Sequence, residues 1–117
     1  MVGAGEKLRL RHRVEGEATV VHPGGEVDVF TAPLLREFLL QLVEDGTRKL
    51  VVDLSEVSFL DSTGLAVLVG VWQRLRYHEG SFALAGANPR ISQVLHTTRL
   101  AQPLRLHDTL EEALAAT

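Results

Sequence analysis

Residues 49–72 read KLVVDLSEVSFLDSTGLAVLVGVW. The run Lys49–Leu54 is almost continuously apolar, which predicts a central β-strand covered on both faces. A helix is predicted to follow from about Ser62 to His78, with Gly80 as its stop. A buried strand that leads into an apolar helix is typical of an α/β sheet whose strands are mostly parallel.

The predicted second helix is apolar on more than one face. Its apolar residues are Leu65, Val67, Leu68, Val69, Val71, Trp72 and Leu75. Such a helix is either deeply buried or presents an apolar surface to a partner. Gly70 costs this helix about 1 kcal/mol against Ala. Either another backbone approaches Gly70 closely, or the helix simply tolerates the cost.

Upstream of this stretch, the sequence predicts a β-hairpin. Lys7–Val14 alternates polar and apolar residues, which is typical of a strand with one exposed face. Glu17–His22 follows after Gly16 and forms the second strand of the hairpin. Pro23-Gly24-Gly25 then predicts a break in the chain, and Glu26-Val27-Asp28 a short extended piece.

A first helix is predicted from Ala32 to about Asp45. Thr31 can cap its start, and Pro33 lies in the first turn, where a missing N–H costs nothing. Gly46 ends the helix in the position that favours glycine. The apolar residues form one broad stripe that we expect to pack on the sheet: Leu34, Leu35, Phe38, Leu39, Leu42 and Val43.

The remaining sequence continues to alternate between strand and helix patterns. Phe82–Ala87 is predicted as a strand, and Pro89–Thr98 as a shorter helix. Leu104–Leu106 is predicted as a short strand, and Asp108 as the cap of a last helix. The whole order predicts a single α/β domain over residues 1–117. Its sheet is mixed and mostly parallel, with an antiparallel N-terminal edge and about four helices.

Composition restricts the possible classes of function. The chain has 117 residues, one domain's worth, and without cysteine it has no disulfide framework or thiolate metal site. Its 12 basic and 15 acidic residues give a net charge of −3, which argues against a nucleic-acid or anionic-membrane surface. No apolar run approaches the ~20 residues that span a bilayer, and Met1–Glu6 lacks the apolar core of a secretory signal. We expect a soluble, cytoplasmic protein.

The sequence carries no recognisable enzyme motif. The histidines form no metal-binding pattern, and they are His12, His22, His78, His96 and His107. No glycine-rich loop predicts a nucleotide cofactor. Ser62 does not lie in the Gly-x-Ser-x-Gly turn of a hydrolase. The order Asp61-Ser62-Thr63-Gly64 has one residue too many for an aspartic-protease loop, and a helix follows where that fold requires a β-ribbon.

The loop Asp61-Ser62-Thr63-Gly64 is nevertheless a candidate site. It lies at the carboxyl end of the strand region, the edge at which open α/β sheets place their working crevice. A hydroxyl at a helix start lies among free backbone N–H groups and at the positive end of the helix dipole, which suits a phosphate. The alternative is that Ser62 or Thr63 merely caps the helix.

A second junction, Gly24–Pro33, carries Asp28 and Thr31 ahead of a helix. By itself it is explained by a glycine-rich turn in which these two side chains satisfy backbone N–H groups. Together with the loop at Ser62, it resembles the anti-sigma factor antagonists built on the STAS domain. The resemblance covers about residues 7–115. The matching segments are Gly25-Glu26-Val27-Asp28, Thr31-Ala32-Pro33, Leu35, Val51-Val52-Asp53-Leu54 and Phe59-Leu60-Asp61-Ser62-Thr63-Gly64-Leu65.

The resemblance implies a partner-switching protein rather than an enzyme. The unphosphorylated antagonist would bind an anti-sigma factor, usually also an ATP-dependent serine kinase, and so free a sigma factor. Phosphorylation would end this complex, and a metal-dependent serine phosphatase would restore it. The family's phosphoacceptor corresponds to Ser62, and Thr63 matches a supporting hydroxyl.

The same resemblance implies which residues bind the partner. Asp28 matches the family's acidic residue near the phosphorylated serine, and Asp61 precedes that serine. The expected partner-binding residues are Asp28, Asp61, Ser62, Thr63 and Gly64. No catalytic, cofactor-binding or metal-binding residue is expected.

Two other functions remain open. STAS domains also serve as scaffold or regulatory subunits of sensory and transport complexes. Those versions usually carry a sensor or membrane domain, whereas this chain ends at Thr117. A small hydrolase using Ser62 would need a base, and no histidine lies within reach of it in sequence or motif.

Overall fold

The apolar run that begins at Lys49 forms the central strand of the fold, as predicted. In the computed structural model, which describes residues 2–3 and 7–117, β6 (Lys49–Asp53) lies between β4 (Ala18–Val21) and β8 (Ser81–Ala85). It runs parallel to both neighbours. The expectation that Met1–Glu6 lacks a secretory signal concerns a segment that lies largely outside the described residues.

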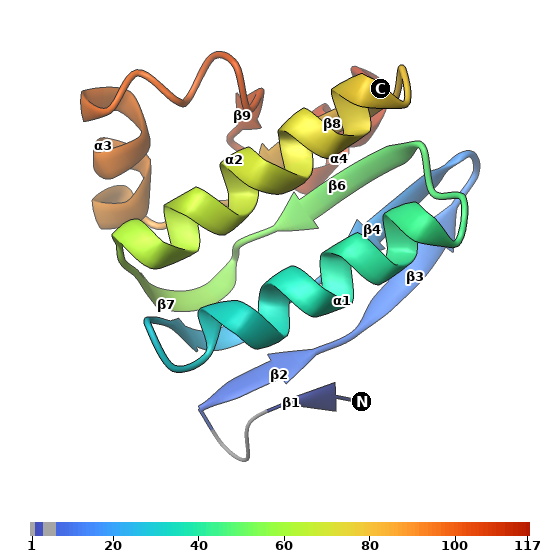
Figure 1. The fold of residues 1–117 in the computed structure, drawn as a ribbon. Coiled ribbons are helices and arrows are strands. Elements are labelled where there is room, and N and C mark those ends of the chain that lie inside the picture. The colour runs from blue at the N-terminus through green and yellow to red at the C-terminus, as the bar shows by residue number, and fades with distance from the viewer. Residues whose placement is uncertain (1, 4–6) are drawn as a thin grey trace.

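The strands form two sheets rather than one (Figure 1). The first has the order β3-β4-β6-β8-β9 and the second β1-β2-β5-β7. The other strands are β1 (Val2–Gly3), β2 (Leu8–Leu10), β3 (His12–Glu15), β5 (Gly24–Val27), β7 (Glu56–Leu60) and β9 (Leu106–His107). The helices are α1 (Ala32–Glu44), α2 (Ser62–Tyr77), α3 (Pro89–Thr97) and α4 (Leu110–Ala115). The predicted α/β class is confirmed, and so is the antiparallel N-terminal edge.

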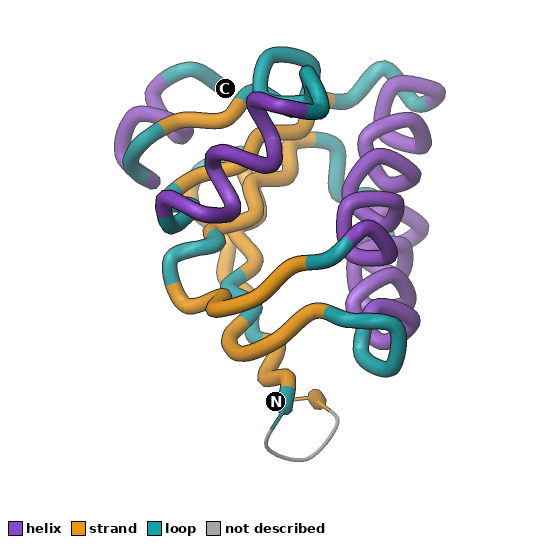
Figure 2. The backbone as a smooth tube through the Cα atoms, turned by 90° about the vertical axis from the view of Figure 1, so that its left-hand side faces the viewer, coloured by secondary structure: helices purple, strands orange, loops and turns teal. Residues whose placement is uncertain are grey.

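Helices α1 and α2 cover one face of the sheets, and α4 covers the other (Figure 2). The larger core lies beneath α1 and α2, and its most deeply buried side chains include Leu35, Leu39, Leu50, Val52, Leu68, Leu75, Phe82 and Leu84. Burial therefore uses most of the apolar surface of α2. Gly70 lies outside this core, since a Cβ built on it would meet nothing within 4 Å. None of the helices in the described residues is long and apolar enough to cross a membrane.

The prediction of one strand over Lys7–Val14 is wrong. The chain passes from β2 to β3 at Arg11 and so leaves one sheet for the other. Beyond that point the predicted hairpin is confirmed, with β3 antiparallel to β4. The alternating pattern could not reveal the change, because the backbone stays extended while its hydrogen-bonding neighbour changes from β5 to β4.

The predicted break at Pro23-Gly24-Gly25 is also wrong, because Gly24 and Gly25 belong to β5. Gly25 has a φ of 110°, and a Cβ built on it would lie 2.2 Å from the carbonyl oxygen of Lys7. The register between β5 and β7 shifts between Gly25 and Glu26. Glycine therefore allows a β-bulge and a close approach of backbone here, rather than a turn.

Helix α1 ends as predicted at Gly46, which has a φ of 110°. The Gly46 N–H donates to the Val43 carbonyl at 3.1 Å, and the Thr47 N–H donates to the Leu42 carbonyl at 3.0 Å. This pair of bonds is the Schellman motif of a glycine-terminated helix. At the end of α2, the residue with positive φ is Glu79 rather than the expected Gly80.

Three further features differ from the sequence predictions. Residues 56–60 form a further strand, β7, between the predicted strand at Lys49–Leu54 and the predicted helix at Ser62. The last strand is Leu106–His107 rather than Leu104–Leu106. Helix α4 is capped by Thr109 instead of Asp108: the Glu112 N–H donates to the Thr109 hydroxyl at 3.1 Å.

Replacing Leu39 by Ala tests the core beneath α1. Leu39 is fully buried, so Leu39→Ala should lower the free energy of unfolding by roughly 2–5 kcal/mol. Denaturant melts measure the loss. A change below about 1 kcal/mol would contradict the assignment of this position to the core.

Replacing Gly25 by Ala tests the close approach of Lys7. Gly25 and Gly46 have the same φ, but a Cβ at Gly46 would meet nothing within 4 Å. The positive φ costs both variants about 1–2 kcal/mol, and only Gly25→Ala also forces the Lys7 backbone away. We expect Gly25→Ala to unfold at clearly lower denaturant concentration than Gly46→Ala. Equal destabilisation of the two variants would show that the approach of Lys7 does not matter.

Candidate functional site

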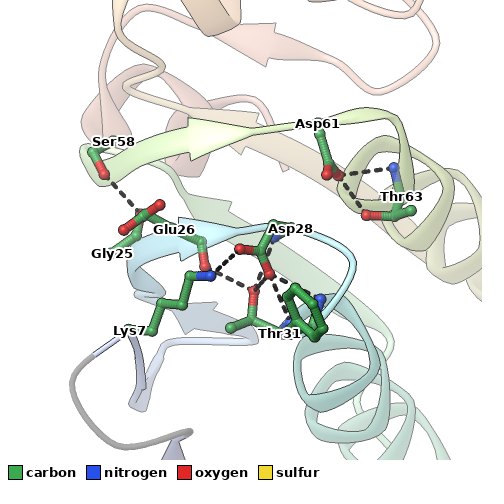
Figure 3. A network of polar contacts seen from close by, with 9 residues as sticks. Lys7, Gly25, Glu26, Asp28, Thr31, Ser58, Asp61 and Thr63 are labelled. Carbon is green, nitrogen blue, oxygen red and sulfur yellow. Dashed lines mark hydrogen bonds and ion pairs between the residues drawn. The ribbon is translucent and has the colours of Figure 1, made fainter.

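The ends of β5 and β7 bring the two candidate aspartates together. The strands are parallel, and Val27 is paired with Leu60. Asp28 and Asp61 directly follow these two residues, each at the end of its strand. The Asp61 N–H donates to the carbonyl of Val27 at 3.2 Å. Figure 3 shows each aspartate close to the start of the helix that follows it. The predicted junctions therefore meet at one edge of the second sheet.

Asp61 caps helix α2, so the alternative in which Ser62 or Thr63 merely caps the helix is wrong. Its carboxylate accepts hydrogen bonds from the Thr63 N–H at 2.9 Å and from the Gly64 N–H at 3.2 Å. It also accepts a short hydrogen bond from the Thr63 hydroxyl. That hydroxyl, followed by the backbone N–H groups of Gly64 and Thr63, holds the pKa of the Asp61 carboxyl below its ordinary value.

The two hydroxyls of the loop differ in their surroundings. Thr63 is half-buried and its hydroxyl is held by Asp61. Ser62 is the exposed first residue of α2. Among the hydrogen bonds of the described residues, the Ser62 hydroxyl makes none. A group bonded to Ser62 would lie at the positive end of a 16-residue helix.

Gly64 is the residue that lets α2 begin so close to the strands. A Cβ on Gly64 would lie 2.5 Å from Leu60 Cδ1 and 2.8 Å from Val27 Cγ1. Both of those side chains are buried at the paired ends of β5 and β7. The glycine of the motif therefore has a packing role that fixes where Ser62 lies.

Asp28 organises the loop between β5 and α1. Its carboxylate forms an ion pair with Lys7 and accepts hydrogen bonds from the N–H groups of Phe30 at 2.9 Å and Thr31 at 3.0 Å. The Thr31 hydroxyl in turn accepts from the Asp28 N–H and donates to the Glu26 carbonyl, at 2.9 and 2.8 Å. The prediction that Asp28 and Thr31 satisfy backbone groups before the helix is confirmed. Thr31 precedes α1, but its side chain does not cap the helix.

The ion pair makes Asp28 strongly acidic. The Lys7 ammonium, followed by the N–H groups of Thr31 and Phe30, lowers the pKa of Asp28 from 3.8 to about 2. Because the folded pKa is depressed, the ionised carboxylate stabilises the fold above the ordinary pKa. This contribution is lost as the pH falls through about 2. The same contact raises the pKa of the Lys7 side chain.

Sequence reasoning missed three residues at this edge. The sequence predicts Lys7 only as part of a strand, although its ammonium neutralises Asp28 and lies 5.3 Å from the centre of the Phe30 ring. Val29 and Phe30 are 58% and 78% exposed. Two adjacent apolar residues within a polar turn are the sequence feature that could have revealed them, since such exposure marks binding surfaces.

Comparison with known proteins agrees with this geometry. The STAS domain family model matches residues 9–113. The anti-sigma-B factor antagonist of Staphylococcus aureus is 36% identical over 104 residues, which cover 89% of this chain and 96% of that protein. An anti-sigma factor antagonist from Mycobacterium paratuberculosis superposes with a TM-score of 0.87 at 32% identity, covering 98% of this chain and 97% of that one.

A more distant structure has the same fold. The phosphorylated form of the Bacillus cell fate determinant SpoIIAA superposes with a TM-score of 0.72 at 22% identity, and the match covers 93% of this chain and 97% of that one. The family model and the closer relatives each span most of this chain. The resemblance expected from the sequence is therefore confirmed. The chain belongs to the STAS domain family, as one of its anti-sigma factor antagonists.

Proposed function

We propose that this antagonist is switched by phosphorylation of Ser62. The unphosphorylated chain binds an anti-sigma factor and so releases a sigma factor. The anti-sigma factor is also the serine kinase that transfers phosphate to Ser62, and a serine phosphatase removes it. Because these partners act on RNA polymerase, the switch operates in the cytoplasm.

The observation that carries the proposal is the difference between the two hydroxyls of the loop. Ser62 is exposed at the first position of α2, whereas the Thr63 hydroxyl is bound to Asp61. In the transfer, the Ser62 oxygen forms a bond to the γ-phosphorus of ATP, the bond to ADP breaks, and the hydroxyl proton is released. SpoIIAA, which shares the fold, has been solved in a phosphorylated form, and this supports the same chemistry here.

The fold can accept a phosphate at Ser62 without rearrangement. The modification adds about −1.5 to −2 charges, and the N-terminus of α2 favours negative charge. Asp61 and Asp28 are already bound to donors within their own loops. The phosphate therefore acts on the complex rather than on the folded chain.

A near-complete change of partner requires Ser62 to lie inside the interface. Changing a bound population from 99:1 to 1:99 requires about 5.5 kcal/mol. A charge at the exposed rim of an interface changes the binding free energy by only ~1 kcal/mol. Added bulk and charge in a desolvated contact, beside Asp61 and Asp28, can supply the larger amount.

Three forms of the protein test the switch. Each candidate anti-sigma factor of the source organism is titrated with phosphoprotein, Ser62→Ala and Ser62→Asp at two salt concentrations. We expect Ser62→Ala to bind like the unmodified chain, Ser62→Asp to bind weakly, and the phosphoprotein to keep its fold but lose the partner. Equal affinity for the modified and unmodified proteins would refute the proposal. If the difference in affinity between the modified and unmodified proteins vanishes at high salt, Ser62 lies at the exposed rim of the interface.

A phosphorylation assay with matched variants identifies the acceptor. With ATP and the bound kinase, mass spectrometry should find one added phosphate on the wild type and on Ser58→Ala. Ser62→Ala should gain none. Ser58 is a suitable control because it is another exposed serine, four residues before Ser62 in strand β7. Phosphate on the Ser62→Ala protein would assign the acceptor elsewhere.

Replacing Asp28 by Asn tests whether this carboxylate acts only within its own loop. Asp28→Asn removes the charge that Lys7 neutralises but keeps an oxygen that can accept from Thr31. We expect a folded protein whose partner affinity or phosphorylation rate differs from the wild type, with Asp108→Asn as an exposed control. If Asp28→Asn folds and its partner affinity and phosphorylation rate are unchanged, the Asp28 carboxylate acts only in the structure of its own loop.

A further inference from the structure

A groove follows the seam between α1 and α2. It consists of two adjoining hollows of about 390 and 250 Å³, which share Arg36, Ala66 and Val67 in their walls. The first hollow opens between Val29 and Thr63, and the second extends along α2 to Arg74. The groove therefore starts beside the Ser62 loop and runs about 16 Å along the helix, three turns in length.

The floor of the groove is made of small residues on α2. Ala66 and Gly70 are both exposed and lie one turn apart on the same face of the helix. Gly70 costs the helix about 1 kcal/mol against Ala, and no atom of the described chain occupies the space of its Cβ. Packing within the chain therefore gives no reason for glycine at this position.

The charges along the groove specify what can occupy it. Arg36 lines both hollows, and within the described residues no carboxylate lies at ion-pair distance from it. Arg74 differs, because Glu44 binds it at 2.7 Å. The groove thus offers one available guanidinium beside the apolar side chains of Val29 and Val67. A complementary segment is apolar on one face and carries a carboxylate opposite Arg36.

The walls also favour a helix as the occupant. They consist of residues of α1 and α2 and of Val29 in the loop before α1, and they include no strand residue with which an extended segment could pair. A helix satisfies its own backbone hydrogen bonds and needs only an apolar face. Small residues at its closest approach allow the helix axes to come within about 8–10 Å.

We infer that the anti-sigma factor binds by laying an amphipathic helix, with a carboxylate directed at Arg36, into this groove. The inference rests on the proposed function and specifies where the partner lies. One end of the bound helix lies at the Thr63 end of the groove, next to Ser62. A phosphate on Ser62 would repel the carboxylate of that helix and would also obstruct the helix sterically. The groove extends the contact well beyond the loop that carries Ser62.

Two substitutions and two controls test the groove. Gly70→Leu adds a bulky side chain to the floor at a position where a Cβ meets no atom within 4 Å, and Arg36→Glu reverses the available charge. Each should weaken binding of the anti-sigma factor that the wild type binds by tenfold or more. The controls are Gln41→Leu, on the exposed side of α1 away from the groove, and Arg90→Glu, on α3. Both should bind within twofold of the wild type.

The outcomes separate this inference from the proposed function. If Gly70→Leu binds like the wild type while phosphorylation of Ser62 still abolishes binding, the switch stands and the groove is refuted. If no anti-sigma factor binds the unmodified wild type, the proposed function fails and the inference falls with it. Sedimentation also tests self-association. If the wild type forms dimers and Gly70→Leu dissociates them, the occupant of the groove is a second copy of the chain and the inference is wrong.

A crosslinking experiment identifies the occupant. The chain has no cysteine, so Pro33→Cys carrying a benzophenone maleimide labels the exposed wall of the first hollow and leaves the floor at Gly70 open. Irradiation of the complex should attach it to a peptide of the anti-sigma factor that forms an amphipathic helix containing Asp or Glu. Attachment to a β-strand or to a basic segment would contradict the inference, and Gln41→Cys serves as the matched control.

Discussion

The parallel pairing of β5 with β7 is the contact on which the site depends. It sets Val27 opposite Leu60, and so makes Asp28 and Asp61 neighbours although they are 33 positions apart in the chain. The pairing also sets the start of α2, because Gly64 packs directly on both of those apolar side chains. A shift of one residue between the strands would turn these side chains away from the core.

The site combines two carboxylates that are already hydrogen-bonded, Asp28 and Asp61, with one exposed hydroxyl, that of Ser62. Asp61 is bound to the start of its own helix, and Asp28 to its loop and to Lys7. In the proposed switch, both carboxylates keep these bonds when Ser62 gains or loses a phosphate. A rigid platform of this kind suits a protein that signals through a change of partner, because the free-energy difference then arises in the contact rather than in refolding. Val29 and Phe30, in the loop that Asp28 organises, are exposed and add an apolar surface to this edge of the molecule.

The errors of sequence interpretation share a physical origin. Alternation over Lys7–Val14 correctly indicates an extended backbone, but it carries no information about which strand lies alongside. Two adjacent glycines at Gly24-Gly25 usually mark a turn, because glycine accepts positive φ. Here the same property serves the approach of the Lys7 backbone within a sheet. In both cases the deciding atoms belong to residues far away in the sequence.

Local sequence is enough to predict the central strand at residues 49–54, the helices beginning at Ala32 and Ser62, and the acidic and hydroxyl residues of the two junctions. These follow from periodicity and from caps, which depend on neighbours a few residues away. Three features depend instead on long-range packing: the division into two sheets, the ion pair of Lys7 with Asp28, and the groove between α1 and α2. All three depend on which segments meet in space, and a hydrophobic pattern specifies that a face is buried without specifying against what.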